Sequence, residues 1–599
     1  MSAAGLLLAA SILLPLAMAA SCLSPRFRAR APSLLVLAPL PAMLAALLLP
    51  DGASASFPVP FRMTLALDPP GAILLGGAAL LWSAAGAYTA SYMGGKPGTQ
   101  GFAVWWLLTL AGSLGVFIVA DFASFYLLFT LASLSAYGLV AHEQTAAARR
   151  AGVVYMVLAL LAEAFLLLAL VMLATGSPDS NPLIRETVAT LPASALRDGI
   201  VLLVILAFAL KMGLVPLHVW LPLAHPAAPM PASAVLSGVL VKAGVIGLIR
   251  FLPFETALPA WGCALAVAGV LTAWYGAAVG LTQRRPKTIL AYSTVSQMGL
   301  VAAIAGAGLA AGDAQTPGLA AYYGVHHTLV KGALFLAVGI ALASGGPRLR
   351  GILLLTGLLA LSLAGLPLTS GALAKLAVKP MLGYGLLSLA ISLAAAGSTM
   401  LMLHFIAVMA RETAQNPDAA ASQSPDHHSS PHPEEARRAV SKDAPAVSGA
   451  SWNILRDAIR SGMAPQDEGS GSFRPDGTWG LIIPFLVVVL ASFVLPWWLY
   501  PAITGDALAS VWQLGSLWKL IWPMLLGAAV FILLRRFDSI AGTIPEGDIL
   551  ALAERQAPLL SRLAAAIEGL DRSLRQWPVA GLLLIGLAIL LGGRFLLSS

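Results

Sequence analysis

The chain has 599 residues, of which 58% are hydrophobic and only 10% are charged, and its mean hydropathy is +0.85. This composition excludes a soluble protein and predicts a polytopic membrane protein. The formal net charge of +8 fits basic residues held on cytoplasmic loops, so it does not indicate nucleic-acid binding. The two cysteines stand far apart, and no glycine-rich nucleotide loop is present. We therefore expect no cofactor, no metal and no redox or hydrolytic site in this chain.

Apolar runs of about twenty residues predict an all-α fold with about sixteen membrane-spanning helices. The expected spans are 4–21, 33–50, 71–91, 102–120, 122–141, 151–174, 198–221, 232–252, 258–281, 288–309, 318–344, 351–380, 383–410, 479–502, 515–535 and 577–597. The first run could be a signal peptide ending near Cys22. It lacks a basic leader, however, and arginines follow it, so we expect it to remain as a spanning helix.

Five basic clusters fix the expected orientation. They are Arg26/Arg28/Arg30, Arg149/Arg150, Arg284/Arg285/Lys287, Arg348/Arg350 and Arg535/Arg536. With the spans above, all five fall on one side of the membrane, which the positive-inside rule makes cytoplasmic. Both termini are then expected on the periplasmic face of a bacterial inner membrane.

Residues 202–254 carry the strongest functional signal. Lys211 and Lys242 each lie in an apolar helix, and a lysine at the centre of a membrane helix costs about 2.5 kcal/mol or more, so it marks an ion path by default. His218 and His225 lie between them among five prolines, and broken helices are tolerated at membrane depth only inside protein or beside a watery cavity. We interpret these residues as part of a proton or ion path. The alternative is that the two lysines snorkel to the membrane surface.

A second cluster lies in the span 318–344. It contains His326, His327 and Lys331, and the last two are four residues apart, so they share one face of the helix. We assign a function to His327 and Lys331. For His326 we favour a polar core residue whose hydrogen bonds are satisfied.

The next span repeats the pattern of a broken helix with a lysine. Gly365, Pro367 and Gly371 interrupt it and Lys375 follows, as the prolines follow Lys211 in the first cluster. Paired interruptions in corresponding halves of a chain are typical of internal transporter repeats.

Two polar segments do not fit a membrane span. Residues 411–478 are rich in Ser, Pro, Ala and His and predict a disordered cytoplasmic insert. Residues 545–575 place leucines at helical spacing among charges, which predicts a short amphipathic helix lying along the cytoplasmic surface.

Three motifs carry a resemblance to a known family. KMGLVPLHVWLPLAHPAAPMPASAVLSGVLVKAGVIGLIR, QRRPKTILAYSTVSQMGL and HHTLVKGALFLAVG closely resemble the antiporter-like, proton-translocating subunits of complex I (NADH:quinone oxidoreductase), Mrp-type cation/proton antiporters and membrane-bound hydrogenases. The resemblance covers about residues 70–410. It implies two inverted five-helix repeats, each with a broken helix, and a central chain of proton-carrying residues. That chain would comprise Lys211, Lys242, Lys331 and Lys375, with His218, His225 and His327 nearby.

The sequence departs from the family pattern at one important position. The family normally has a glutamate at the position of Thr130, as the partner of the lysine matching Lys211. Glu163, in the middle of the next helix, is an isolated carboxylate among leucines and is costly there unless it is paired. We expect Glu163 to have taken over as the partner of Lys211; the alternative is a protonated glutamate with a structural role. Gln297 stands where many relatives have a histidine, so that relay step would run through Lys331 and water.

The expected organisation therefore has five regions. They are N-terminal helices (1–100), a first repeat (101–252), a second repeat (253–410), the insert (411–478) and C-terminal helices with the lateral helix (479–599). The expected function is proton translocation, driven by a redox partner or an ion gradient, in a complex with other membrane subunits. The alternatives are a subunit of a secondary Na+ or K+/proton antiporter and the membrane half of an inorganic-carbon uptake system.

Overall fold

The computed structural model describes most of residues 1–415 and part of the C-terminal region. The described residues are 2–58, 62–94, 96, 98–176, 181–344, 346–383, 385–415, 478–534, 545 and 548–549. Residues 1–546 form one compact unit, and residues 547–599 form a second unit. Most of the predicted insert, nearly all of the predicted lateral helix and the last predicted span lie outside the described residues.

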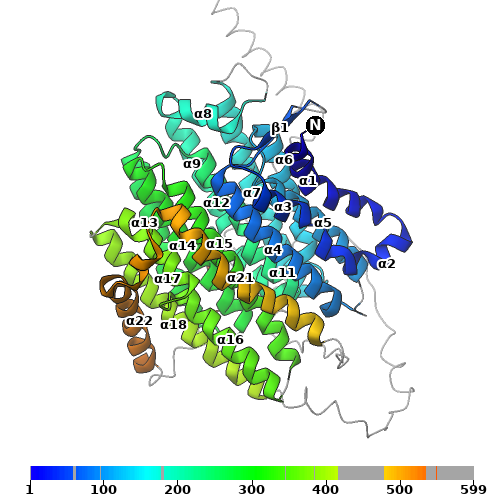
Figure 1. Ribbon diagram of the computed structural model, residues 1–599, viewed down its shortest axis with the longest axis vertical. Coiled ribbons are helices and arrows are strands. Elements are labelled where there is room, and N and C mark those ends of the chain that lie inside the picture. Colours follow the sequence, from blue (N-terminus) through cyan, green and yellow to red (C-terminus); the bar gives the residue numbers. More distant parts are fainter. Residues whose placement is uncertain are drawn as a thin grey trace, which may run out of the picture. The chain divides into compact units, whose positions relative to one another are not determined.

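The described part of the chain is almost entirely helical (Figure 1). Its α-helices are α1 (Ala3–Ser21), α2 (Pro25–Leu34), α3 (Leu40–Leu48), α4 (Pro69–Tyr92), α5 (Thr99–Gly115), α6 (Phe122–Val140), α7 (Ala146–Ala174), α8 (Ile184–Thr190), α9 (Arg197–Met212), α10 (Trp220–Ala227), α11 (Met230–Val235), α12 (Val241–Phe251), α13 (Pro259–Gly280), α14 (Pro286–Ala311), α15 (Thr316–Ala343), α16 (Gly346–Ala364), α17 (Ser370–Leu382), α18 (Leu386–Gln415), α21 (Thr478–Thr504) and α22 (Leu514–Leu534). Short 3-10 turns η1 (Leu35–Leu37), η2 (Leu191–Ala193) and η6 (Leu508–Trp512) and a π turn η3 (Leu236–Leu240) join some of them. One antiparallel hairpin, β1 (Ser54–Phe57) with β2 (Met63–Ala66), pairs Ser54 with Ala66.

The fold class is confirmed as a polytopic all-α membrane protein. Among the described residues, 12 helices are long and apolar enough to cross a membrane. Every predicted span except the last coincides with one helix or with consecutive shorter helices. The count of about sixteen is not established, because only these 12 described helices meet the criteria for a span and the last predicted span lies outside the described part.

The first predicted helix break lies close to Lys211. Helix α9 ends at Met212, and Gly213 adopts a left-handed conformation with φ of 76°. The chain resumes as the short helix α10, so His225 lies on a helix and His218 lies in the break. Further on, α11 passes through the π turn directly into α12, and Lys242 is the second residue after that turn. A π turn inside a helix often marks a functional position.

The second predicted break separates α16 from α17. It spans Gly365 to Thr369, where Gly365 has φ of 100° and Leu368 has φ of 67°. Gly371 was expected in the break but lies inside α17. A Cβ atom on Gly371 would stand 1.8 Å from the carbonyl oxygen of Ser362. The glycine is needed there for close approach of the two half-helices rather than to end one of them.

Glycines bring α13 and α14 into backbone contact. Gly262, Gly269 and Gly276 repeat every seven residues along α13, and a Cβ on Gly269 would lie 2.4 Å from the amide nitrogen of Ala303 in α14. Small residues allow such close packing between membrane helices, where van der Waals contact replaces the hydrophobic effect as the main attraction. Helix α15 packs against α14, α4 and α21, and α21 crosses it in Figure 1. As a result α15 is almost wholly enclosed.

Candidate ion-translocation site

The central lysines end inside the protein rather than at its surface. Lys211 is 4% exposed, Lys242 is 1% exposed and Lys331 is 0% exposed. They come from α9, α12 and α15, and the span holding Lys242 is completely enclosed by other helices. A snorkelling lysine keeps its ammonium group at the surface, so this geometry does not fit the snorkelling alternative.

Lys211 lies against the helix that carries the expected glutamate position. Its Nζ donates to Ser133 Oγ at 2.7 Å, and the hydroxyl of Ser133 in turn donates to the Phe129 carbonyl at 2.8 Å. The Nζ also lies 5.0 Å from the centre of the Phe129 ring. One serine and one aromatic face thus hold this ammonium group in an otherwise apolar interior.

Glu163 points into the protein toward this lysine. It is 4% exposed, and Thr130 Oγ1 donates to its Oε2 at 2.5 Å. Ser133 and Lys211 both interact with the Glu163 carboxyl group, while its Oε1 has no hydrogen-bond partner among the described residues. No ion pair within 4.0 Å joins the described side chains of Glu163 and Lys211. Ser133 therefore contacts both charged groups, and Thr130, where the family pattern has a glutamate, donates to the Glu163 carboxyl group.

Lys242 and His327 are in direct contact. Lys242 Nζ lies 2.5 Å from His327 Nδ1 and donates to the carbonyl of Ser237, on the π turn, at 3.1 Å. The other ring nitrogen of His327 has no hydrogen-bond partner among the described residues. The contact joins α12 to α15, which lie in the two different regions that the sequence predicts to be repeats. A lysine and a histidine at this distance share one hydrogen bond, so a proton can lie between them.

Lys331, one turn after His327 on α15, is held by α14. Its Nζ donates to Ser293 Oγ and to the Leu290 carbonyl, both at 2.5 Å. It also lies 5.6 Å from the centre of the Phe335 ring, whose other neighbour is the ring of His225 at 5.0 Å. Both ring nitrogens of His225 lack hydrogen-bond partners among the described residues.

His326 and Gln297 have satisfied polar contacts. His326 Nδ1 lies 3.0 Å from Ser370 Oγ, at the start of α17. Gln297 accepts from Tyr323 at 2.7 Å and donates to Ser398 at 3.1 Å. These contacts agree with the expectation that His326 is a polar core residue, although it lies beside the second helix break.

The remaining predicted residues lie at the two helix breaks. Lys375 hydrogen-bonds through its Nζ to the carbonyl oxygen of Ala364, the last residue of α16. His218 is 0% exposed and its ring lies 5.1 Å from that of Tyr275. Within the described part of the chain, no three His, Cys, Asp or Glu side chains are grouped so that they could hold a metal ion.

The sequence did not predict two kinds of contact. These are the serines that bind Lys211 and Lys331, and the contact of Lys287 with the end of α10. Ser133 and Ser293 lie three residues after Thr130 and Leu290. The only sign of these contacts in the sequence was a serine inside an apolar helix. Lys287 was counted as a cytoplasmic loop charge. It is only 9% exposed, and its Nζ donates to the Ala228 carbonyl at 3.2 Å, at the end of the helix that carries His225.

Comparisons with known proteins point to one family of membrane subunits. Residues 120–403 match the family described as NADH:quinone oxidoreductase/Mrp antiporter, TM. Hydrogenase-4 component B of Escherichia coli is 31% identical over 301 residues, covering 48% of this chain and 44% of that protein. NADH-quinone oxidoreductase subunit N of Desulforudis audaxviator is 30% identical over 347 residues, covering 55% of this chain and 66% of that protein. The structure of the Mrp complex from Dietzia sp. DQ12-45-1b matches with a TM-score of 0.67 and 21% identity, covering 99% of this chain and 63% of that chain.

The fold and the buried lysines define a polytopic, antiporter-like membrane protein. Through residues 120–403, the chain belongs to the NADH:quinone oxidoreductase/Mrp antiporter family, which includes complex I, Mrp and hydrogenase subunits. The chain spans less than half the length of the hydrogenase-4 relative. The similarity to the Mrp complex shows a shared fold.

Proposed function

We propose that this chain is a proton-translocating subunit of a larger complex in a bacterial inner membrane. The proton path would run through Glu163, Lys211, Lys242, His327, Lys331 and Lys375, with His218 and His225 beside it. The observation that carries the proposal is the buried contact of 2.5 Å between Lys242 and His327, which joins the two repeats. Two basic groups enclosed in this way are costly to charge together, so they favour sharing or passing on a proton.

The neighbouring contacts supply steps on either side of this pair. Lys331 lies four residues after His327 on α15 and is coupled electrostatically to Lys242. Ser293 and Ser133 hold the lysine ends at hydrogen-bond distance, and a hydroxyl can both accept and donate a proton. Lys375, at the second break, acts electrostatically on His326. The driving energy would come from partner subunits, with both termini of this chain on the periplasmic face.

A second candidate is a subunit of a secondary Na+ or K+/proton antiporter, because the matched family includes Mrp antiporters. The same lysine path would then serve exchange rather than redox-driven pumping. The two candidates differ in what drives proton movement. A respiratory substrate drives it in the first, and an imposed sodium or potassium gradient drives it in the second.

Proton movement into inverted membrane vesicles, followed with a pH-sensitive dye, tests the path in the assembled complex. Lys242→Ala and Lys211→Ala should each abolish it while the protein remains inserted, because each removes a buried carrier. Lys96→Ala is the control. This lysine lies in the loop between α4 and α5, stacked on the Tyr92 ring at 3.8 Å and exposed. Full translocation by a well-expressed Lys211→Ala variant would refute the central lysine path.

A further inference from the structure

A small cavity lies where α22 packs against α17 and α18. Its volume is about 50 Å³, which is room for about three or four water molecules. Its polar lining consists of Lys375, Lys379, Lys519, Tyr323, Ser388 and Ser392. No acidic side chain of the described residues lines the cavity. It is therefore a basic site within an apolar bundle.

The positive charges in this cavity are not neutralised by the described residues. Lys375 is held by the Ala364 carbonyl, but no hydrogen bond or ion pair of Lys379 or Lys519 occurs in the described part of the chain. Lys379 and Lys519 are also close enough to repel each other electrostatically. Like charges in a partly desolvated site raise the free energy of the empty cavity. An anion would relieve this repulsion.

The position of the lysines along their helices suits a headgroup. Lys379 lies in the last turn of α17, Lys519 lies in the second turn of α22, and Ser388 lies in the first turn of α18. The ends of membrane-spanning helices lie at the level of the lipid headgroups. Lys379 and Lys519 are both partly exposed, so an external ligand can reach them.

The rest of the cavity wall is apolar. Leu382, Ile391 and Leu520 line it together with other aliphatic residues. On α22, Leu525 is 58% exposed and Ile532 is 63% exposed, so this helix also presents apolar side chains to its surroundings. A free anion would gain nothing from aliphatic walls, whereas the first carbons of a lipid would be buried against them.

We propose that this cavity binds the phosphate group of an anionic phospholipid. Lys379 and Lys519 contact the phosphate oxygens, and the hydroxyl group of Ser388 donates to them. The glycerol and upper acyl carbons lie against the aliphatic wall. A lipid in this position would connect α22 to the half-helix that follows the second break. This inference does not depend on the direction or driving force of transport.

The test is a lipid titration of the detergent-solubilised full-length chain, followed by native mass spectrometry. Phosphatidylglycerol should bind more tightly than phosphatidylcholine, which has no net charge. Each lysine near a lipid surface contributes roughly fivefold in affinity, so Lys379→Gln with Lys519→Gln should weaken phosphatidylglycerol binding about 25-fold. The double variant with arginine at both positions keeps the charges and should retain binding. It also shows whether loss of binding reflects loss of folding.

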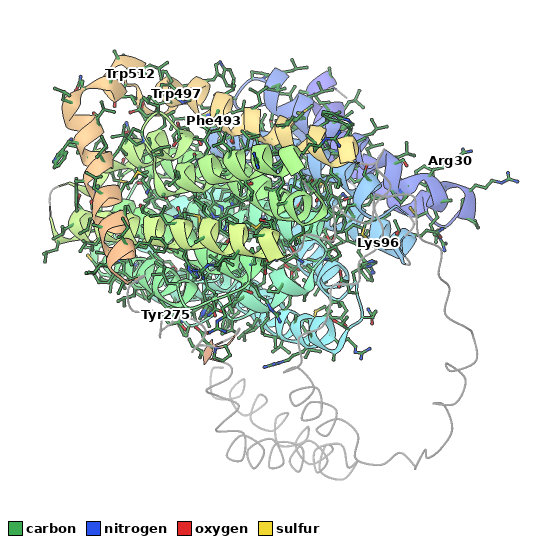
Figure 2. All side chains as sticks on the ribbon, turned by 90° about the horizontal axis from the view of Figure 1, so that it is seen from below. Arg30, Lys96, Tyr275, Phe493, Trp497 and Trp512 are labelled. Atoms are coloured by element: carbon green, nitrogen blue, oxygen red, sulfur yellow. The ribbon has the colours of Figure 1, made fainter. Side chains whose placement is uncertain are left out.

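A single charge deletion outside the cavity controls for general electrostatic attraction, which would weaken binding about fivefold wherever the lysine lies. Lys96→Gln removes one positive charge far from this site; Figure 2 shows Lys96 on the opposite side of the helical bundle from Trp512, which precedes α22. This variant should bind phosphatidylglycerol as the wild type does. Equal affinity for the two lipids, or an about fivefold loss of phosphatidylglycerol affinity in Lys96→Gln, would overturn the proposal. Tight binding of inorganic phosphate alone, without preference for phosphatidylglycerol, would overturn the lipid assignment.

Discussion

The replacement Glu163→Gln tests the relocated carboxylate most directly. Glutamine keeps the size of the side chain and can still accept the hydrogen bond from Thr130, which is 2.5 Å long in the structure. The change removes the negative charge that acts on Lys211. Because the side chain is 4% exposed, solvent cannot replace that charge.

The expected size of the effect follows from the arrangement around Ser133. With one hydroxyl between them, the two charged groups lie roughly 5 Å apart, and unit charges at that distance attract by about 3 kcal/mol at an effective dielectric constant of ~20. If that whole interaction helps the proton to move, the rate falls about 100-fold; if half of it does, the rate falls about tenfold. We therefore expect proton translocation by Glu163→Gln to be about 10- to 100-fold slower than that of the wild type.

A rescue variant separates charge from structure. Thr130→Glu in the Glu163→Gln background restores a carboxylate at the position that the family normally uses. Thr130 lies one turn before Ser133 on α6, so the new carboxylate would remain beside Lys211. The double variant should recover part of the translocation in the vesicle assay, whereas Thr130→Gln in the same background should not.

Two results would refute this reasoning. Normal translocation by Glu163→Gln would show that the charge is not needed. A loss in Glu163→Gln that Thr130→Glu does not relieve, together with a lowered midpoint of thermal unfolding, would show that Glu163 has the structural role of the alternative hypothesis. In either case Lys211 would have to function with Ser133 alone.

Three further predictions concern packing and the insert. Gly269→Ala places a Cβ atom 2.4 Å from a backbone nitrogen of α14 and should destabilise the protein by about 1–3 kcal/mol. Gly318→Ala is the control and should not destabilise it, because a Cβ at Gly318 has no neighbour within 4 Å. Thermal unfolding in detergent compares the two variants. Arg250 binds Asp68 and three backbone carbonyl oxygens, so Arg250→Ala should cost about 3 kcal/mol, and an unchanged unfolding midpoint would contradict this. Deletion of Pro417–Asp476 should leave translocation near normal because its composition predicts few packing contacts, and loss of assembly in the deletion variant would show instead that the insert binds a partner.

The sequence alone determined the class of fold and the residues with unusual chemistry. Runs of apolar residues long enough to span a bilayer fix the helices, because backbone polar groups in lipid must be satisfied within the helix. The prolines after Lys211 and the pair Gly365 and Pro367 could be located as breaks, because proline lacks a backbone donor and glycine is a poor helix former. Lys211, Lys242 and Lys331 stood out because a charge among leucines is too costly to be accidental.

Tertiary structure decided which of these residues meet. The contact between Lys242 and His327 joins positions 85 residues apart, and no periodicity within a single helix encodes such a pairing. The contact of Ser133 with both Lys211 and the Glu163 carboxyl group likewise depends on how α6, α7 and α9 pack together.

Packing at the C-terminal helices also brings together residues that no sequence pattern pairs. Trp497 and Trp512 lie near each other where α21 is followed by η6 (Figure 2), with ring centres 6.4 Å apart. The helix after that turn, α22, then brings Lys519 to Lys379, 140 positions earlier in the chain. The sequence specifies each helix through local hydrogen bonding and apolar surface. The cationic cavity arises only from side-chain packing between helices that are distant along the chain, so tertiary structure alone decides it.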